Sequence, residues 1–324
     1  MNMNIDELIK SIDERINELD TKETYYENKP FIEKISFELE EIQNNIELIY
    51  NKYLSEFDNL IGLTEVKDEL KKLINYLIFT KKVGNKVNLD KINLNMVFRG
   101  NPGTGKTTVA RIVAKILCEL GFLKSNKVIE TTPRDFIAGY IGQTAIKANS
   151  TIKKAEGGVI FIDEAYTFAQ TMDEEGKSFA PEAITEIIKE METCNTAFIF
   201  SGYSKEMDEF IELNPGIRSR IAYDIEFKNY TKDELFSIFE NKLKKIGMDL
   251  TPKAKEILLE KIEIKMKNKN FGNGRMIDNL FNEILREHAT NNIYEVDENK
   301  LLLINEDTVK KIKTKKIEGG MHFE

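Results

Sequence analysis

One short stretch, residues 100–107, constrains the fold of this chain more than any other. It reads GNPGTGKT and satisfies the phosphate-binding pattern G-x-x-x-x-G-K-[ST] in full. An apolar run at 94–98 predicts a buried strand before it, and apolar residues at helical spacing over 109–120 predict a helix after it. In this context the glycines let backbone N–H groups surround phosphates, and the helix N-terminus adds its positive dipole end. We expect a nucleoside triphosphate here, with Lys106 on its β- and γ-phosphates and Thr107 offering a hydroxyl to Mg²⁺.

A second chemical feature is an acidic pair, Asp163 and Glu164, at the end of the apolar run 159–162. An acidic pair at a strand end is often merely solvated. Its position about fifty residues after the phosphate-binding stretch favours a role in phosphoryl transfer. Asp163 would then hold Mg²⁺ through its water shell, and Glu164 would orient or deprotonate the attacking water.

The sequence pattern divides the chain into three predicted parts, of which two surround and follow the phosphate-binding stretch. Apolar runs at 127–131, 159–162 and 196–200 alternate with helical patterns, which is typical of a parallel sheet covered by helices on both faces. One of these helices is expected to begin at Thr132. From about Phe227 the chain reads as helical, with helix-start signals at 231–234, 251–252 and 272–275. We therefore expect a large α/β domain at 56–226 and a small helical domain at 227–324.

The N-terminal residues, 1–55, form the third predicted part. Apolar residues recur at helical spacing over 5–20 and again over 31–53, which predicts two antiparallel helices. Thirteen acidic and six basic side chains make this hairpin acidic. Two interpretations stay open: an arm that packs against the body or a neighbouring subunit, and a docking module for a partner.

Composition narrows the function classes. The chain has 324 residues and a net charge of −8, and residues 227–324 hold 17 acidic and 19 basic side chains. A duplex-binding protein usually carries a basic domain or stripe, so nucleic acid is not expected as the main partner. The apolar runs are too short for a membrane span and no basic-then-apolar leader is present, so a cytoplasmic location is expected. Cysteines at 118 and 194 read as small buried hydrophobes, and the two histidines, at 288 and 322, offer no metal cluster.

Five stretches together resemble one branch of the AAA+ ATPases. They are FRGNPGTGKTTVAR at 98–111, GYIGQTA at 139–145, GGVIFIDEAY at 157–166, NPGIRSR at 214–220 and GNGR at 272–275. The branch holds the stage V sporulation protein K ATPases, the red-type Rubisco activases and the ATPase domain of type VII secretion chaperones. The resemblance covers about residues 57–312 and not the hairpin. It implies a P-loop AAA+ parallel sheet flanked by helices, a small all-helical lid, and Mg²⁺-dependent hydrolysis of ATP.

The resemblance also implies roles for single residues. Leu60, Ile61 and Gly62 match the segment that packs on adenine. Arg275 matches the sensor 2 arginine, which closes the lid over the γ-phosphate. The complete predicted set for ATP is Ile61, Gly62, Asn101, Pro102, Gly103, Thr104, Gly105, Lys106, Thr107, Thr108, Asp163 and Arg275, with Thr107 and Asp163 toward the metal.

Catalytic groups beyond Lys106, Glu164 and Arg275 come from two further matches. Arg220 matches the arginine finger that enters a neighbouring subunit's site, and Arg218 is a close rival. Such a finger is worth about 10³–10⁵ in rate. The sensor 1 position follows the strand at 196–200, but the usual Asn or Thr is absent, and the candidates are Ser201, Tyr203 and Ser204.

The motif GYIG places Tyr140 and Ile141 where the branch has its central-pore residues. A tyrosine between glycines on an exposed loop suits gripping an extended chain without reading its sequence, although a tyrosine that caps an apolar patch would look the same. The expected function is an ATP-dependent ring, a homo-hexamer, that pulls on or disassembles a protein substrate. The alternatives are a nucleotide-controlled scaffold that recruits partners through the hairpin and, with less support, a DNA-acting motor.

Overall fold

The computed structural model describes residues 44, 47–48, 50–53, 55–83, 92–140, 142–169, 179–193, 195–212, 214–268 and 271–313. Most of the hairpin predicted at 1–55 lies outside the described residues. Ile141, Cys194 and His322 also lie outside them. Within the described part, no helix is both long and apolar enough to cross a lipid bilayer.

A five-stranded sheet forms the centre of the molecule, and all its strand pairs are parallel. Four of the strands, β1 to β4, overlap the apolar runs that sequence predicts, and β3 has the predicted bounds. Every residue of β3 and β4 is buried, as expected of strands that are covered on both faces. Across the sheet the strands are β2 (Val128–Thr131), β3 (Val159–Ile162), β4 (Ala197–Gly202), β1 (Met96–Gly100) and β5 (Tyr223–Phe227).

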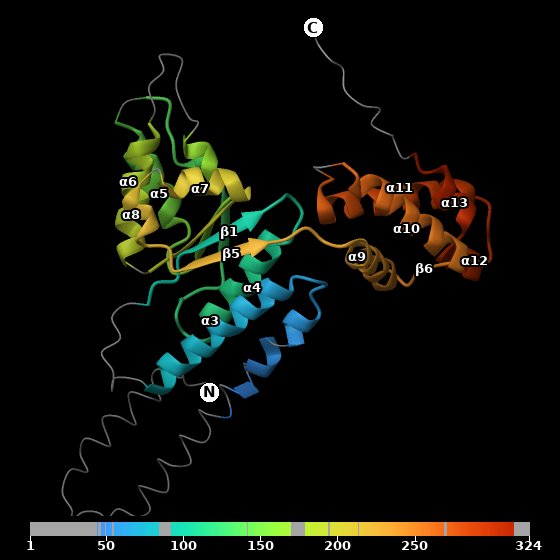
Figure 1. Ribbon diagram of the computed structural model, residues 1–324, viewed down its shortest axis with the longest axis horizontal. Coiled ribbons are helices and arrows are strands. Elements are labelled where there is room, and N and C mark those ends of the chain that lie inside the picture. The colour runs from blue at the N-terminus through green and yellow to red at the C-terminus, as the bar shows by residue number, and fades with distance from the viewer. Residues whose placement is uncertain are drawn as a thin grey trace, which may run out of the picture.

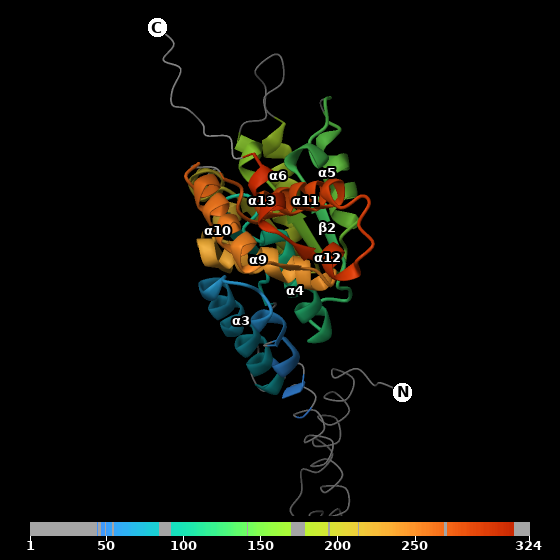
Figure 2. The same cartoon turned by 90° about the vertical axis from the view of Figure 1, so that its right-hand side faces the viewer.

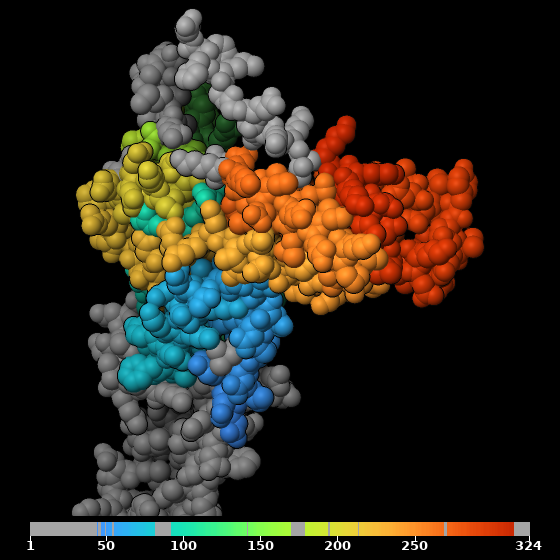
Figure 3. Space-filling model, turned by 45° about the vertical axis from the view of Figure 1, so that its right-hand side comes forward, coloured from blue at the N-terminus to red at the C-terminus, as the bar shows by residue number. Residues whose placement is uncertain are grey.

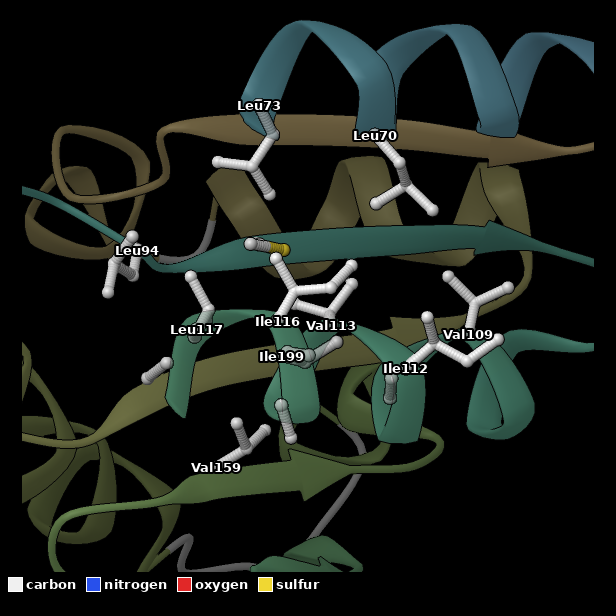
Figure 4. Close-up of a cluster of buried hydrophobic side chains, with 14 of the residues drawn as sticks. Leu70, Leu73, Leu94, Val109, Ile112, Val113, Ile116, Leu117, Val159 and Ile199 are labelled. Atoms are coloured by element: carbon white, nitrogen blue, oxygen red, sulfur yellow. The ribbon is translucent and has the colours of Figure 1, made fainter. Parts of the chain in front are cut away.

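Two helices cover one face of this sheet. They are α3 (Thr64–Val83) and α4 (Lys106–Glu119), and the second begins inside the phosphate-binding stretch. Figure 4 shows leucines of α3 pointing toward the strands, and Val113 and Ile116 of α4 in the same apolar layer as Val159 and Ile199. Each such side chain contributes about 1.5–3 kcal/mol by burial, so this layer holds α4 against the sheet.

The other face of the sheet carries a second apolar core, which includes Phe136, Phe168, Phe200 and Phe210. The helices that supply it lie together on the left in Figure 1. They are α5 (Thr144–Lys153), α6 (Ala180–Thr193), α7 (Ser204–Glu212) and the short α8 (Pro215–Arg218). The predicted α/β fold with a parallel sheet flanked by helices is thus confirmed.

Helical residues just before the phosphate-binding domain attach to the first core. Residues 50–53 and 55–58 are helical, and the side chains of Tyr53 and Phe57 are fully buried in the core that holds α4. The ammonium group of Lys52 lies 2.7 Å from a carboxylate oxygen of Glu119, the last residue of α4. The chain therefore enters the domain along the helix that follows the phosphate-binding stretch.

A separate helical bundle follows β5. It lies to the right of the sheet domain in Figure 1 and in front of it in Figure 2, and it has an apolar core of its own. Its first helix begins at the predicted capping box: the backbone N–H of Glu234 donates to Thr231 Oγ1, and that of Thr231 donates to the Glu234 carboxylate. The predicted helical lid is confirmed. Its elements are α9 (Lys232–Lys245), β6 (Asp249–Leu250), α10 (Pro252–Met266), α11 (Asn273–Asn291), α12 (Glu298–Leu302), β7 (Leu303–Ile304) and α13 (Glu306–Lys311).

Two sequence expectations differ from the structure, and one strand has no counterpart among the predictions. The helix expected from Thr132 is a single 3₁₀ turn, Pro133–Asp135, because Gly139 and Gly142 interrupt the helical pattern before α5. Strand β5 was not predicted, since only Ile225 and Phe227 of its side chains are buried and its run is too short for a clear alternation. Cys118 is half-buried and not part of the core.

Candidate active site

A cavity of about 430 Å³ lies between the carboxyl ends of the strands and the helical lid. Ligands of open α/β sheets bind at this edge. Figure 3 shows the lid packed directly beside the sheet domain. Most of the residues that sequence analysis assigns to ATP line this cavity together. They are Ile61, Pro102, Gly103, Gly105, Lys106, Thr107, Thr108, Asp163 and Arg275. The predicted catalytic residue Glu164 lines the cavity with them.

The backbone carbonyl groups of the phosphate-binding stretch all accept hydrogen bonds. The carbonyl groups of residues 102, 103 and 104 accept from Asn273 Nδ2 at 3.3 Å, from the N–H of Gly274 at 2.9 Å and from the Tyr230 hydroxyl at 3.2 Å. The two preceding carbonyls accept from Lys106 Nζ. The lid and the segment leading to it therefore hold the outer side of the loop.

The inner side of the loop presents N–H groups. Within the described part of the chain, the backbone N–H groups of Gly103, Thr104, Gly105 and Lys106 donate to no other protein group. Gly103 and Gly105 have φ of 74° and 96°, a conformation that L side chains rarely adopt. This arrangement is a cradle for an anion at the N-terminus of α4.

Lys106 lies in this cradle. Its ammonium group donates to Gly100 O at 2.7 Å and to Asn101 O at 2.8 Å. Burial lowers the pKa of Lys106 to about 8, against the attraction of Asp163, and Arg275 lowers it further. An anion of several charges beside it would restore the ammonium form, as expected of a group that binds phosphates.

Asp163 is oriented by two hydrogen bonds to one carboxylate oxygen. Ser201 Oγ donates to Asp163 Oδ1 at 3.0 Å, and the N–H of Glu164 donates to the same atom at 3.1 Å. The other oxygen accepts from no group in the described part of the chain, and Thr107 lines the same cavity. Mg²⁺ prefers oxygen ligands, retains several waters and commonly uses one or two side chains plus substrate phosphates. The residues present fit such an ion.

Glu164 has an unusual backbone conformation. Its φ is 51°, a left-handed value that is uncommon outside glycine and is often found at functional sites. The turn continues as the N–H of Thr167 donates to Glu164 O at 2.8 Å. Next to Glu164, burial and its carboxylate charge raise the pKa of Tyr166 to about 12. The Tyr166 hydroxyl therefore stays protonated across the physiological range.

The structure separates the three candidates for the sensor 1 position. Ser201 is fully buried and donates to Asp163. Ser204 Oγ donates to Glu226 Oε1 at 2.6 Å, away from the cavity. Tyr203 lines the cavity, with its ring 5.8 Å from the ring of Tyr166. Of the three candidates, Tyr203 lines the cavity, and Ser201 is linked to it only through Asp163.

The lid meets the loop at the N-terminus of α11. Asn273 has φ of 48°, its Oδ1 accepts from the N–H of Tyr230 at 3.0 Å, and its Nδ2 also donates to Asn229 Oδ1 at 3.0 Å. A Cβ atom added at Gly103 would lie only 2.2 Å from the carbonyl oxygen of Gly272. Backbone thus packs on backbone at this junction, and Arg275, two residues later, faces the cavity.

Apolar side chains from both domains also line the cavity, beside polar ones. Leu60 and Ile61 line it from the sheet domain, and Ile238 lines it from α9 of the lid. Asn241 and Lys245 lie further along the same helix. A planar base fits between apolar walls of this kind.

Some predicted residues lie outside the cavity. Thr104 is fully buried and its hydroxyl donates to Asn101 O at 2.8 Å. Asn101 donates through Nδ2 to Asn229 at 2.9 Å. Gly62, with φ of 62°, packs against the carboxylate of Glu234 in the lid. These residues shape the loop and its junction with the lid.

The two predicted finger arginines lie near α8, on the side of the sheet domain away from the lid (Figure 1). Arg220 is 27% exposed; its guanidinium contacts the Glu192 carboxylate and donates to Gly216 O at 3.0 Å. Arg218 is exposed and forms no ion pair within the described part of the chain. Neither arginine lines the cavity of its own chain.

Tyr140 is also remote from the cavity, and 73% of its surface is exposed. The N–H of Ala138 donates to the buried Thr144 Oγ1 at 3.2 Å, and Lys147 Nζ donates to Ile137 O at 2.7 Å. The base of the loop is therefore fixed to α5 while Tyr140 projects. Ile141, its predicted companion, lies outside the described residues.

Sequence reasoning missed several residues at the site. Tyr230 and Asn273 hold the loop, and Tyr166 lies beside Glu164. The sequence gives a weak signal for two of these residues. Asn273 lies inside the GNGR motif, and Tyr166 follows the acidic pair by two residues. Ile238 and Asn241 have helical spacing but no motif, so nothing in the sequence marks them as site residues.

Comparison with known proteins gives a consistent result. Residues 96–229 match the family model described as the ATPase family associated with various cellular activities (AAA), and residues 231–318 match an AAA lid domain. Stage V sporulation protein K of Bacillus subtilis is 36% identical over 240 residues, which cover 72% of this chain and 74% of that protein. The chloroplastic ribulose bisphosphate carboxylase/oxygenase activase of Cyanidioschyzon merolae is 37% identical, with 75% and 83% covered.

A third relative is longer, and the structural neighbours are more distant. The ESX-1 secretion system protein EccA1 of Mycobacterium leprae is 40% identical over 64% of this chain but only 36% of its own length. The RuvB Holliday junction branch migration motor of Thermotoga maritima has a TM-score of 0.51 at 22% identity, with 78% of this chain and 69% of that chain covered. The AAA domain of FIGL-1 in complex with ADP has a TM-score of 0.53 at 16% identity, with 78% and 81% covered. At these identities the two structures show a shared fold alone.

The lowered pKa of Lys106 predicts that ATP binding at alkaline pH is coupled to proton uptake. Its lowered pKa means that much of it is neutral at pH 8.5 before a nucleotide binds. Phosphates restore the ammonium, so ATP binding at pH 8.5 will take up a substantial fraction of a proton. Calorimetry in two buffers of different ionisation enthalpy measures this uptake. Lys106→Arg, which stays charged, will bind with almost no uptake. Equal uptake in both proteins would show that another group titrates.

Substitutions of Asn273 test whether the junction between the phosphate-binding loop and the lid supports nucleotide binding. Asn273→Gly keeps the left-handed conformation but loses the side-chain hydrogen bonds, and we expect nucleotide binding weaker by about tenfold, since each bond contributes about 0.5–1.5 kcal/mol. Asn273→Ala will bind more weakly still, because it adds backbone strain. The control is Asn279→Ala, an exposed residue of the same helix. Calorimetric titration with ADP measures the affinity of each variant. An unchanged affinity in Asn273→Gly would show that the side chain of Asn273 does not support the phosphate-binding loop.

Proposed function

Because this chain belongs to the AAA family of ATPases and hydrolyses ATP, we propose that it assembles as a homo-hexameric ring that pulls on a protein chain through a central pore. The resemblance that its motifs predict is confirmed by the family and lid matches and by relatives of 36–40% identity. The observation that carries the proposal is Tyr140, an exposed aromatic residue on a loop with a fixed base, outside the nucleotide cavity.

The proposed chemistry uses the residues of the cavity. The N–H groups of the loop and Lys106 bind the β- and γ-phosphates. Thr107 and Asp163 would hold Mg²⁺, which neutralises charge on the phosphates when bound. Glu164 orients the attacking water and accepts its proton. Arg275 approaches the γ-phosphate from the lid.

Ser201 and Tyr203 divide the sensor 1 role in this proposal. Ser201 orients Asp163, to which it donates a hydrogen bond. Tyr203 offers its hydroxyl to the cavity beside Glu164 and Tyr166. In this proposal the two residues together replace the usual Asn or Thr.

The proposed ring supplies the finger arginine in trans. Arg220 and Arg218 lie away from their own cavity, so either can act only on a neighbouring chain's nucleotide. Arg220 is held by Glu192, and its buried Nε has no partner in the described part of the chain. We propose that Arg220 exchanges Glu192 for the neighbour's γ-phosphate. Arg218, which is exposed, is the alternative.

The proposed division of the chain is the one that sequence indicates: a hairpin at 1–55, a large domain at 56–226 and a lid at 227–324. The alternative function, a nucleotide-controlled scaffold, has one specific observation in its favour. Tyr53, Phe57 and the Lys52–Glu119 ion pair join the end of the N-terminal part to the helix that follows the phosphate-binding loop. A partner bound to the N-terminal part would act on the far end of the helix whose N-terminus faces the phosphates.

Tyr140 provides the test of the pulling function. We expect an unfolded polypeptide, such as reduced and alkylated casein, to stimulate the ATPase of the wild-type chain. Tyr140→Ala will keep basal turnover within about twofold and lose the stimulation, because the loop touches the polypeptide and not the nucleotide. Tyr140→Phe will retain it, since the aromatic area is kept.

Two outcomes would contradict this proposal. A parallel loss of basal and stimulated turnover in Tyr140→Ala would assign a structural role to Tyr140. Turnover of the wild type that no polypeptide changes would favour the scaffold. Ile146→Ala serves as the matched control, because Ile146 is 72% exposed on the neighbouring helix α5. It tests whether any exposed apolar side chain of this surface has the same effect.

A further inference from the structure

One face of lid helix α9 lines the nucleotide cavity. Ile238, Asn241, Lys242 and Lys245 all contribute to the cavity wall, and their spacing of three and four residues places them on a single side of the helix. Of these four residues, only Ile238 is apolar and belongs to the apolar walls described above. The residues assigned above to the phosphates do not include the three polar residues of this face.

The position of the phosphates decides what reaches this face. The phosphate cradle, the acidic pair and Arg275 occupy one end of the cavity. A base joined to those phosphates through ribose must lie at the other end, between Leu60 and Ile61 on one side and Ile238 on the other. Asn241 follows Ile238 by three residues on the same face of α9, so its amide lies beside the apolar wall that Ile238 forms.

The helix face is held in place by a neighbouring contact. Lys242 Nζ lies 2.7 Å from Asp278 Oδ1 and 5.1 Å from the ring centroid of Phe281, both on α11. Asn241, in contrast, is exposed, and its side-chain amide makes no hydrogen bond within the described part of the chain. A fixed helix thus presents one amide with a free donor and a free acceptor to the cavity.

The chemistry of an amide matches one edge of adenine. An asparagine amide can accept from the adenine N6 amino group and donate to N7 at the same time. Guanine and hypoxanthine carry an oxygen at position 6, so both atoms of that edge are acceptors. The amide then makes one bond and places its oxygen against another oxygen. Lys245 offers only donors and does not discriminate in this way.

We propose that Asn241 selects adenine by a bidentate contact to its N6/N7 edge. This proposal rests on the proposed placement of the nucleotide. Asn59 is the other amide of the cavity wall, on the opposite rim, and it precedes the segment expected to pack on the base. Both side chains are exposed. The geometry favours Asn241, because it projects from the long helix α9, whereas Asn59 lies in the turn that leads into Ile61.

The test compares three diphosphates, ADP, IDP and 7-deaza-ADP, by calorimetric titration of the full chain with Mg²⁺. Diphosphates avoid hydrolysis and do not depend on the finger arginine. We expect the wild type to bind ADP about ten- to a hundredfold more tightly than IDP, the range of one bidentate base contact. The affinity for 7-deaza-ADP, which lacks the N7 acceptor, will fall between the two.

In Asn241→Ala we expect the affinities for ADP and IDP to differ by no more than about threefold, mainly because ADP binds more weakly. Lys244→Ala, an adjacent exposed residue outside the cavity, will keep the wild-type ratio. An unchanged ratio in Asn241→Ala would overturn the inference, and so would loss of the ratio in Asn59→Ala alone. Failure of the wild type to bind any of the three would instead overturn the proposed nucleotide site.

Discussion

The site depends on the hydrogen bonds that the lid and its connecting segment donate to the backbone of the phosphate-binding loop. Three consecutive carbonyl groups, those of residues 102 to 104, accept from Asn273, Gly274 and Tyr230. When the carbonyls turn outward, the N–H groups of the same peptides turn inward, where a phosphate would bind. At about 0.5–1.5 kcal/mol each, these bonds couple the position of the lid to the affinity of the loop.

Much of the fold follows from local sequence patterns. The strands β1 to β4 are short apolar runs, the lid helices begin at capping signals, and the GKT and Asp-Glu stretches carry their chemistry within a few residues. The less predictable features involve residues distant in the sequence. Tyr230 meets the loop across 126 positions and Asn273 across 171. No period or motif links such pairs, since their contact arises only when the two domains pack.

The same reason explains the remaining differences. β5 is recognised as a strand through its pairing with β1, not through its own alternation. The wall formed by α9 is an ordinary amphipathic helix until the lid docks on the sheet domain. The separation of Ser201 from Tyr203 depends on which side of the strand end each side chain lies. The sequence could therefore supply the candidates but not choose among them.

The central claim is that ATP joins two chains, since the arginines and Tyr140 lie away from the cavity of their own chain. The most direct measurement is the solution mass of Glu164→Gln by light scattering, with and without ATP and Mg²⁺. We expect growth from about one chain mass, 37.4 kDa, to about six, and smaller particles when Arg220→Ala is added. A chain that binds ATP and stays at one chain mass would contradict a finger in trans and a pore that contains Tyr140.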